Sequence, residues 1–232
     1  KQMVFIKFPI TYHLSFSKIT DREDKVLPEK ETEEFLEQKL IVQEKFDGTN
    51  IGISFQNGDL MVQNRGSYLC LDDLDRLDEY KGFTKWINQR KDSLKATLTS
   101  SEILFIEWMY WEHTVKYDSL PDLGIGLDIY KKKNDKFLNT SRVKKILSGK
   151  VFTPEILYKG KITPEIIEEL LNQNSSYSNQ PREGLILRQD SRNYNIQRAK
   201  IVSDKFQISS THWKSVPKTA NICKYNINFY DL

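Results

Sequence analysis

A single lysine lies between two apolar, strand-like runs near residue 45. The segments Ile41–Phe46 and Asn50–Phe55 are rich in β-branched and aromatic residues, which favours two strands. Between them, Asp47-Gly48 permits a sharp change in chain direction. Lys45 is therefore expected at the end of a strand, where rigid structure would hold its amine in place.

The pattern Lys45-Phe-Asp-Gly48 fits two different roles. A lysine that is buried or lies beside other cations has a lowered pKa and can act as a nucleophile. A lysine on an ordinary surface hairpin, whose Asp-Gly pair only makes the turn, has no such role. Three fixed positions are weak evidence, so this stretch alone favours the hairpin.

The rest of the chain predicts an α+β fold with mainly antiparallel sheets flanked by helices. Asn57-Gly58 is a strong signal for a type I′ hairpin, because both residues tolerate a positive φ. Strand-like segments outnumber helical ones and do not alternate with them regularly. The other expected strands are Val4–Phe8, Leu60–Asn64, Glu102–Met109, Leu123–Tyr130, Gly184–Arg188 and Tyr194–Val202. The expected helices are Glu31–Gln38, one long or broken helix over Leu71–Leu98, one from a cap at Thr140 or Ser141 to Leu147, and one from the cap Thr163 to Gln173.

The composition argues against several classes of protein. With 38% hydrophobic and 12% aromatic residues, the 232-residue chain has enough apolar side chains for a sizeable core. Its 35 Lys and Arg against 32 Asp and Glu give a net charge of +3, which permits a polyanionic partner without demanding one. No run of about 18 apolar residues predicts a membrane span, and Lys1 begins no secretion signal. Two distant cysteines and three scattered histidines predict neither a disulfide framework nor a metal cage, which suits the cytoplasm or another reducing intracellular compartment.

Two carboxylates lie beside apolar strand-like runs. Glu107 is inside the run Phe105–Trp108, and Glu183 directly precedes a second run. A carboxylate in such a position lies either on the exposed side of a half-buried strand or against a specific partner, because an unpaired buried charge is costly. Both interpretations remain open from these residues alone.

Three cations lie in or directly after strand-like segments. Arg65 comes after Leu60–Asn64 and offers a guanidinium suited to a phosphate. Arg198 and Lys200 are two residues apart and therefore share one face of a strand. Each has an ordinary interpretation as surface charge, but together with Lys45 they indicate a phosphate-handling site. Two cations beside the amine would lower its pKa.

These pieces resemble the motifs of the covalent nucleotidyltransferases, the superfamily of nucleotide-dependent DNA ligases, RNA ligases and mRNA capping enzymes. Glu44-Lys-Phe-Asp-Gly-Thr-Asn50 is similar to the first motif, which contains the lysine that takes up the nucleotide. The further matches are Phe105–Trp108, Gly126–Ile129, Glu183–Ile186 and Arg198–Lys200, and together they cover about Ile41 to Phe206. Within the superfamily, Glu44, Thr49 and Asn50 resemble the RNA ligase 2 branch of ATP-dependent RNA ligases, since the other branches more usually carry arginine near position 50.

The resemblance implies a three-step reaction that seals 5′-phosphate and 3′-hydroxyl ends of RNA. Lys45 would attack the α-phosphate of ATP and form lysyl-AMP, the AMP would pass to an RNA 5′-phosphate, and a 3′-hydroxyl would then displace it. Mg²⁺, or Mn²⁺ in its place, would offset the triphosphate charge. The implied catalytic residues are Lys45, Lys200, Glu107 and Glu183, with Glu183 also on the metal. The implied nucleotide-binding residues are Glu44, Asn50, Arg65, Glu107, Glu183, Arg198 and Lys200.

We therefore expect one nucleotidyltransferase domain over residues 1–206 and a tail of the same domain over 207–232, without a separate OB or C-terminal RNA-binding domain. The expected partner is RNA, in the form of nicked or broken duplex ends, and the expected protein is a monomer that contacts no membrane. Three alternatives remain open: a DNA ligase or GTP-using capping enzyme, a non-catalytic nucleic-acid-binding module of ligase fold, and a structural or protein-interaction domain.

Overall fold

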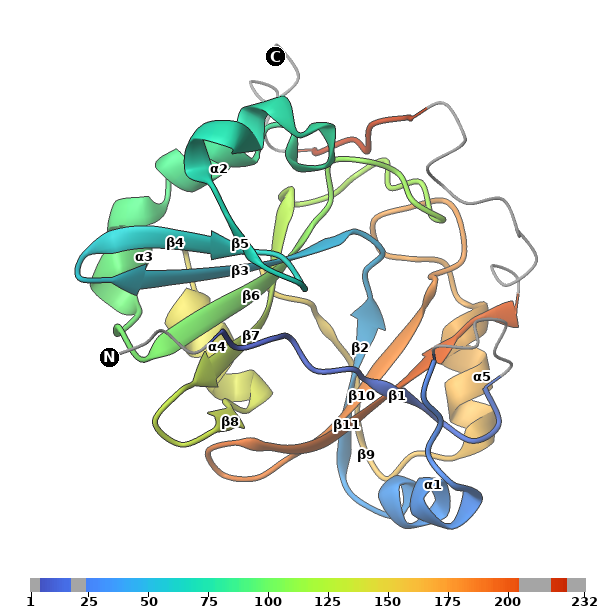
Figure 1. Cartoon of the computed structure of the whole chain (residues 1–232). Coiled ribbons are helices and arrows are strands. Elements are labelled where there is room, and N and C mark those ends of the chain that lie inside the picture. Colours follow the sequence, from blue (N-terminus) through green and yellow to red (C-terminus); the bar gives the residue numbers. More distant parts are fainter. Residues whose placement is uncertain (1–4, 18–23, 205–217, 225–232) are drawn as a thin grey trace.

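The computed structural model describes residues 5–17, 24–204 and 218–224 and contains two β-sheets that lie against each other (Figure 1). The five-stranded sheet has the order β1-β11-β10-β2-β9, and the six-stranded sheet has the order β5-β4-β3-β6-β7-β8. All neighbouring strands are antiparallel except β1 and β11. The strands are β1 Tyr12–His13, β2 Leu40–Lys45, β3 Thr49–Gln56, β4 Asp59–Gln63, β5 Tyr68–Leu69, β6 Glu102–Trp108, β7 Gly124–Lys131, β8 Lys136–Phe137, β9 Ile156–Gly160, β10 Gly184–Asp190 and β11 Asn195–Val202. The predicted α+β class with mainly antiparallel sheets is confirmed.

The helices are short and lie outside the sheets (Figure 1). They are α1 Glu29–Leu36, α2 Phe83–Asn88, α3 Lys91–Thr97, α4 Thr140–Leu147 and α5 Pro164–Asn172, with 3₁₀ turns η1 Leu71–Arg76 and η2 Asp78–Tyr80. The predicted helix over Leu71–Leu98 is thus the broken form, and Gly82, with a φ of 78°, precedes α2. Thr163 caps α5 as predicted. The cap of α4 is Asn139, whose side chain accepts from the Arg142 amide, so the prediction of Thr140 or Ser141 is wrong by one or two residues.

The chain changes sheets at the Asp-Gly pair. Asn57 and Gly58 have positive φ values of 50° and 91° and join β3 to β4 as the predicted hairpin. By contrast, β2 and β3 belong to different sheets, so the interpretation of Asp47-Gly48 as the turn of a hairpin is wrong. The last residue of β2, Lys45, therefore lies where the chain crosses from one sheet to the other.

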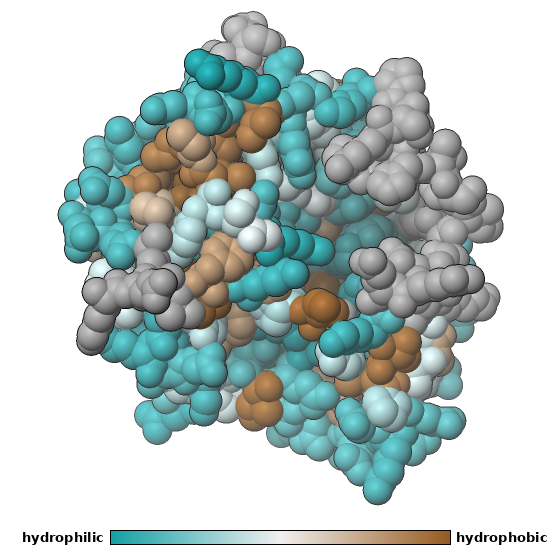
Figure 2. All heavy atoms as spheres, viewed as in Figure 1, coloured by the Kyte–Doolittle hydropathy of each residue, from teal (hydrophilic) through white to brown (hydrophobic). Residues whose placement is uncertain are grey.

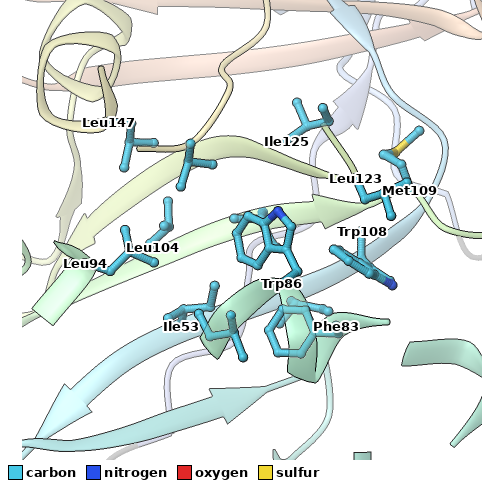
Figure 3. Packing of buried hydrophobic residues seen from close by; sticks show 14 of the residues in the cluster. Ile53, Phe83, Trp86, Leu94, Leu104, Trp108, Met109, Leu123, Ile125 and Leu147 are labelled. Carbon is cyan, nitrogen blue, oxygen red and sulfur yellow. The ribbon is translucent and has the colours of Figure 1, made fainter. Parts of the chain in front are cut away.

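Each sheet has its own hydrophobic core. In the larger one, α2 packs Phe83 and Trp86 onto Trp108 of β6, with Trp86 and Trp108 centroids 5.8 Å apart (Figure 3). The other core lies between the five-stranded sheet and helices α1 and α5, around residues such as Val42, Leu185 and Ile167. Burial of aromatic and aliphatic side chains is the main favourable contribution to the folding free energy, so the two cores stabilise the two sheets.

The structure differs from the sequence prediction at two further places, one expected strand and one unexpected strand. Phe5–Phe8 is not a strand, and Val4 lies outside the described residues; Phe8 instead packs on Phe105 at 4.9 Å between ring centroids. Strand β9 was not predicted, because Ile156–Gly160 is half-exposed at the sheet edge and lacks clear alternation.

The surface seen in Figure 2 is mainly hydrophilic, with hydrophobic residues in several separate patches. Among the described residues, no helix is long and apolar enough to cross a membrane.

Candidate active site

The lysines Lys45 and Lys200 lie on the same face of the five-stranded sheet. Lys45 pairs with Gly184, and Lys200 pairs with Ile186 two residues further along β10. Strand spacing and rise then place the two Cα atoms about 12 Å apart. Since each side chain reaches about 6 Å, both ammonium groups can meet one phosphate between them. The opposite face of the sheet is filled by its hydrophobic core.

Lys45 is paired with Glu183. Its Nζ donates to both carboxylate oxygens, at 2.7 and 2.5 Å, and the two side chains are 22% and 11% exposed. Burial acts to lower the pKa of Lys45, but Glu183, Asp47 and Glu107 outweigh it and raise that pKa. The expectation that neighbouring cations lower the pKa of Lys45 is therefore wrong, because three carboxylates surround the amine.

Glu183 titrates far above an ordinary glutamate. Burial is the largest cause, Asp47 and Glu107 add to it, Lys45 opposes it, and the pKa of Glu183 rises to about 8. Asp47 and Glu107 are therefore close enough to Glu183 to affect its ionisation.

Glu107 and Asn50 are directly opposite each other on strands β6 and β3. Glu107 is buried and accepts from the Gly48 amide at 3.2 Å, which fixes the crossover loop beside Lys45. A Cβ on Gly48 would lie 2.5 Å from the Trp108 carbonyl oxygen, so only glycine allows this approach. Asn50 is buried too and donates to the Ile106 carbonyl at 3.4 Å. The structure thus brings both predicted residues to the cleft beside Lys45.

Asp47 anchors the other side of the crossover. Its Oδ2 accepts from the Thr114 amide at 2.6 Å, and its Oδ1 lies 3.8 Å from His113 Nδ1. The sequence alone assigns no role to His113 or Thr114, because a loop of mixed polar residues carries no signal for the strand end that it contacts. The contact makes the loop after β6 part of the wall around Lys45.

Lys200 has a carboxylate partner that the sequence did not suggest. Its Nζ donates to Oδ1 of Asp24 at 2.8 Å, and Oδ2 of Asp24 lies 3.1 Å from Nε2 of the buried His13. Asp24 and His13 belong to the polar N-terminal part of the chain, which has no pattern that would connect it to β11.

Arg198 is directed to a different partner from Lys200. With Arg188 it forms the arginine cluster, in which both guanidinium groups donate to the buried Asp128 of β7. The Arg188 Nη2 to Asp128 Oδ1 distance is 2.6 Å, and the Arg198 Nη1 to Oδ2 distance is 2.5 Å. This cluster joins the two sheets, whereas a nucleotide contact by Arg198 stays a prediction.

A small cavity of about 60 Å³ lies between the sheets next to the arginine cluster. Two aliphatic side chains, Leu127 of β7 and Ile186 of β10, line it, and so do Gln43 and Glu44 of β2. The charged side chains of Asp128, Arg188 and Arg198 line it as well. The buried Glu44 carboxylate has a pKa raised by burial.

Arg65 lies in the exposed loop after β4. It is close enough to Glu107 to act against the effect of burial, which raises the pKa of that carboxyl. Its charge therefore acts on the Glu107 carboxyl from that loop.

A divalent cation fits this site only together with a ligand. No group of three metal-ligating side chains occurs within residues 5–17, 24–204 and 218–224. Magnesium, however, usually keeps several waters and is held by one or two carboxylates plus phosphates. Glu183, beside Lys45, can supply one such carboxylate.

Comparison with known proteins agrees with this geometry. The family model "RNA ligase" matches residues 38–202. The fold is similar to a Naegleria gruberi RNA ligase variant solved with ATP and Mn, at 16% identity and a TM-score of 0.58, covering 89% of this chain and 63% of that one. The same enzyme solved with PPi gives 17% identity and a TM-score of 0.57, with the same coverage. No curated protein matches.

The chain therefore has the nucleotidyltransferase fold that RNA ligases share. The chain belongs to the RNA ligase family, whose model spans the segment from just before β2 to the end of β11. The chain spans less than two thirds of the solved relatives it resembles.

Proposed function

We propose that this chain is an ATP-dependent RNA ligase that joins 5′-phosphate and 3′-hydroxyl ends through lysyl-AMP and RNA-adenylate. The observation that carries the proposal is Lys45 at the crossover between the sheets, bonded to Glu183 and on the same sheet face as Lys200. Membership of the RNA ligase family supports it. The relatives solved with ATP, AMP and Mn support ATP and a divalent cation as cofactors.

In the first step, the Lys45 amine attacks the α-phosphorus of ATP. A P–N bond forms, the P–O bond to pyrophosphate breaks, and pyrophosphate leaves with the electron pair of that bond. The attacking nitrogen must first lose a proton. Glu183 is already hydrogen-bonded to it and has a pKa of about 8, close to the working pH, so the proton needs to move only within this pair.

Lys200 stabilises the charge that develops on the α-phosphate. Its position on the same sheet face lets its ammonium meet the phosphate from the side opposite Lys45. Fixed charges in a site with little water are stronger than the same charges in solution. Bound magnesium, held through Glu183 and the phosphates, would neutralise the triphosphate.

The base and ribose have candidate contacts along the same cleft. The family resemblance would place the adenine beside the backbone at Glu44, which lines the small cavity between the sheets. Glu107 and Asn50 lie beside Lys45, where they would hold the ribose and the phosphates. These assignments follow the family resemblance.

We further propose nicked or broken duplex RNA as the substrate, a monomeric protein and a reducing intracellular compartment. Cys70 and Cys223 lie far apart in the sequence without a CxxC pair, which supports a reducing compartment. In the second step the AMP passes from Lys45 to the RNA 5′-phosphate, and in the third the 3′-hydroxyl displaces AMP, which closes the strand.

Labelling with [α-³²P]ATP and Mg²⁺ tests this proposal. We expect an acid-labile adduct that maps to Lys45 and is absent from Lys45→Arg, which keeps the charge but not the nucleophile. A chase with nicked RNA–DNA and DNA–DNA duplexes then shows which ends accept AMP. Labelling by GTP instead of ATP, or transfer only to DNA ends, would overturn the RNA ligase assignment, and no adduct at all would leave a binding module.

A further inference from the structure

The carboxylate of Asp24 divides its two oxygens between two partners in the cleft. Oδ1 accepts from Lys200 Nζ at 2.8 Å, and Oδ2 lies 3.1 Å from His13 Nε2. The other ring nitrogen of His13 is 3.0 Å from the Ser17 hydroxyl. Asp24 is thus hydrogen-bonded through one oxygen to Lys200, and its other oxygen lies beside the buried His13 ring, which leaves the carboxylate little room on that side.

Backbone pairing fixes this arrangement to β11. His13 is opposite Lys200 in the parallel pair of β1 and β11, and the Leu14 amide donates to the Lys200 carbonyl at 3.0 Å. The His13 amide donates to the Lys25 carbonyl at 2.7 Å, and the Leu27 amide donates to the His13 carbonyl at 2.8 Å. Asp24 therefore reaches Lys200 from a segment that is hydrogen-bonded to the same strand.

The charges of the three groups agree with the geometry. Burial acts to raise the pKa of Asp24, but Lys200 and then His13 outweigh it, so the pKa of Asp24 is lowered and the carboxylate is ionised at neutral pH. Burial and Lys200 lower the pKa of His13, which favours the neutral imidazole. The pair of Asp24 and Lys200 is thus a charge-assisted hydrogen bond with a neutral histidine behind it.

We propose that Asp24 is a positioning residue that directs the Lys200 ammonium toward the α-phosphate, with the segment around His13 holding Asp24 beside β11. An ammonium has three N–H donors, so one can remain on Asp24 while others meet phosphate oxygens. Without that contact, the flexible four-carbon side chain would be free to take other rotamers, and ordering it would reduce the gain from the phosphate contact.

The inference rests on the proposed function, because it concerns the step that forms lysyl-AMP. A purely structural role for Asp24, which only fastens the N-terminal segment to β11, makes a different prediction. A structural role would lower stability and affect catalysis in any background, whereas a positioning role requires the Lys200 ammonium.

The test is a double-mutant cycle on the single-turnover rate of lysyl-AMP formation, with ATP and Mg²⁺ in the full chain. We expect Asp24→Asn to slow this rate by about 10-fold, as misplacement of a catalytic group does, and Asp24→Glu to restore part of it. In a Lys200→Ala background, the same Asp24→Asn change should alter the rate by less than about 2-fold.

Glu102→Gln is the matched control. Glu102 of β6 forms an ion pair with Lys131 of β7, with Oε1 and Nζ 3.1 Å apart. Along β6, Glu102 is five residues, or about 17 Å, from Glu107. The Glu102→Gln substitution removes a comparable ion pair far from Lys45 and Lys200. The variant should therefore form lysyl-AMP at the same rate as the unmodified chain.

Three results would decide against the inference. Equal slowing by Asp24→Asn with and without Lys200 would show that Asp24 does not act through the lysine, and an unchanged rate would remove its role altogether. An increase in rate would mean that Asp24 competes with the phosphate. By contrast, an unmodified chain that takes no label from ATP would overturn the proposed function itself.

Discussion

Two groups of cations lie on one face of the five-stranded sheet and are held differently. Lys45 and Lys200 each meet a carboxylate and keep side chains 22% and 17% exposed. In the arginine cluster, Asp128 and Arg188 are 2% and 3% exposed, and one carboxylate serves two guanidinium groups that join the sheets. Arg198 and Lys200 are only two residues apart, yet one stabilises the fold and the other remains able to meet a ligand. The difference lies in the partners, because Arg198 meets the buried Asp128 of β7 and Lys200 meets the half-exposed Asp24.

The largest expected effect is the loss of stability on breaking the arginine cluster. Asp128→Asn removes the carboxylate to which both buried guanidinium groups donate and leaves only the more distant Asp190, 4.0 Å from Arg188 Nε, as a counter-charge. Breaking such a buried pair typically costs about 3–5 kcal/mol. Urea unfolding followed by circular dichroism measures it. Glu34→Gln, which breaks an exposed pair with Lys30, is the control and should cost less than about 1 kcal/mol. An equally small loss for Asp128→Asn would remove the distinction between the two groups.

The same cluster gives a pH dependence. Burial acts to raise the pKa of Asp128, but Arg188 and Arg198 outweigh it and the pKa is lowered. Its contribution to stability is therefore fully present above the unfolded-state pKa of about 4 and is lost as the pH falls through the lower folded-state value. The difference in unfolding free energy between the unmodified chain and Asp128→Asn should be constant from pH 5 to 7, within about 0.5 kcal/mol, and should shrink below about pH 4. A difference that persists unchanged at about pH 2 would contradict an ionised Asp128.

The next effect concerns catalysis at the lysines. Lys200→Ala removes a positive charge from the α-phosphate and should slow lysyl-AMP formation by about 100-fold or more. Its unfolding free energy should stay within about 1 kcal/mol of the unmodified chain, because its partner Asp24 is 30% exposed and can be solvated. Quench-flow labelling with ATP, together with urea unfolding, separates the two quantities. A large loss of stability with normal labelling would assign Lys200 to the structural group.

The smallest effect comes from exchanging the cation of the arginine cluster. Arg198→Lys keeps the charge but loses the two-pronged contact with Asp128, so we expect a loss of about 1–2 kcal/mol. Labelling by ATP at a permissive temperature should remain within about 3-fold of the unmodified rate. Labelling by Arg198→Lys that is faster than this limit would indicate that residue 198 contacts the phosphates of ATP.

The sequence predicted the strands around Lys45 well, since hydrophobic runs and the Asn57-Gly58 turn are local signals. It predicted the candidate site only as a set of residues. Local patterns cannot show that β2 and β3 enter different sheets, and that crossover is what brings Glu183 and Glu107 to Lys45. The pKa of Lys45 was expected in the wrong direction for the same reason, because the sequence contains both the cations and the carboxylates but does not show which of them lie nearest to the amine.

By itself, the sequence determined the class of fold, the lysine at the end of β2 and the resemblance to ligase motifs, because periodicity and short motifs are properties of neighbouring residues. Only the tertiary structure decided which charges are paired. It placed Asp24 and His13 on Lys200 and turned Arg198 toward Asp128. Electrostatic energy depends on distances of a few ångströms between residues far apart in the chain, and only the packing of the two sheets sets those distances.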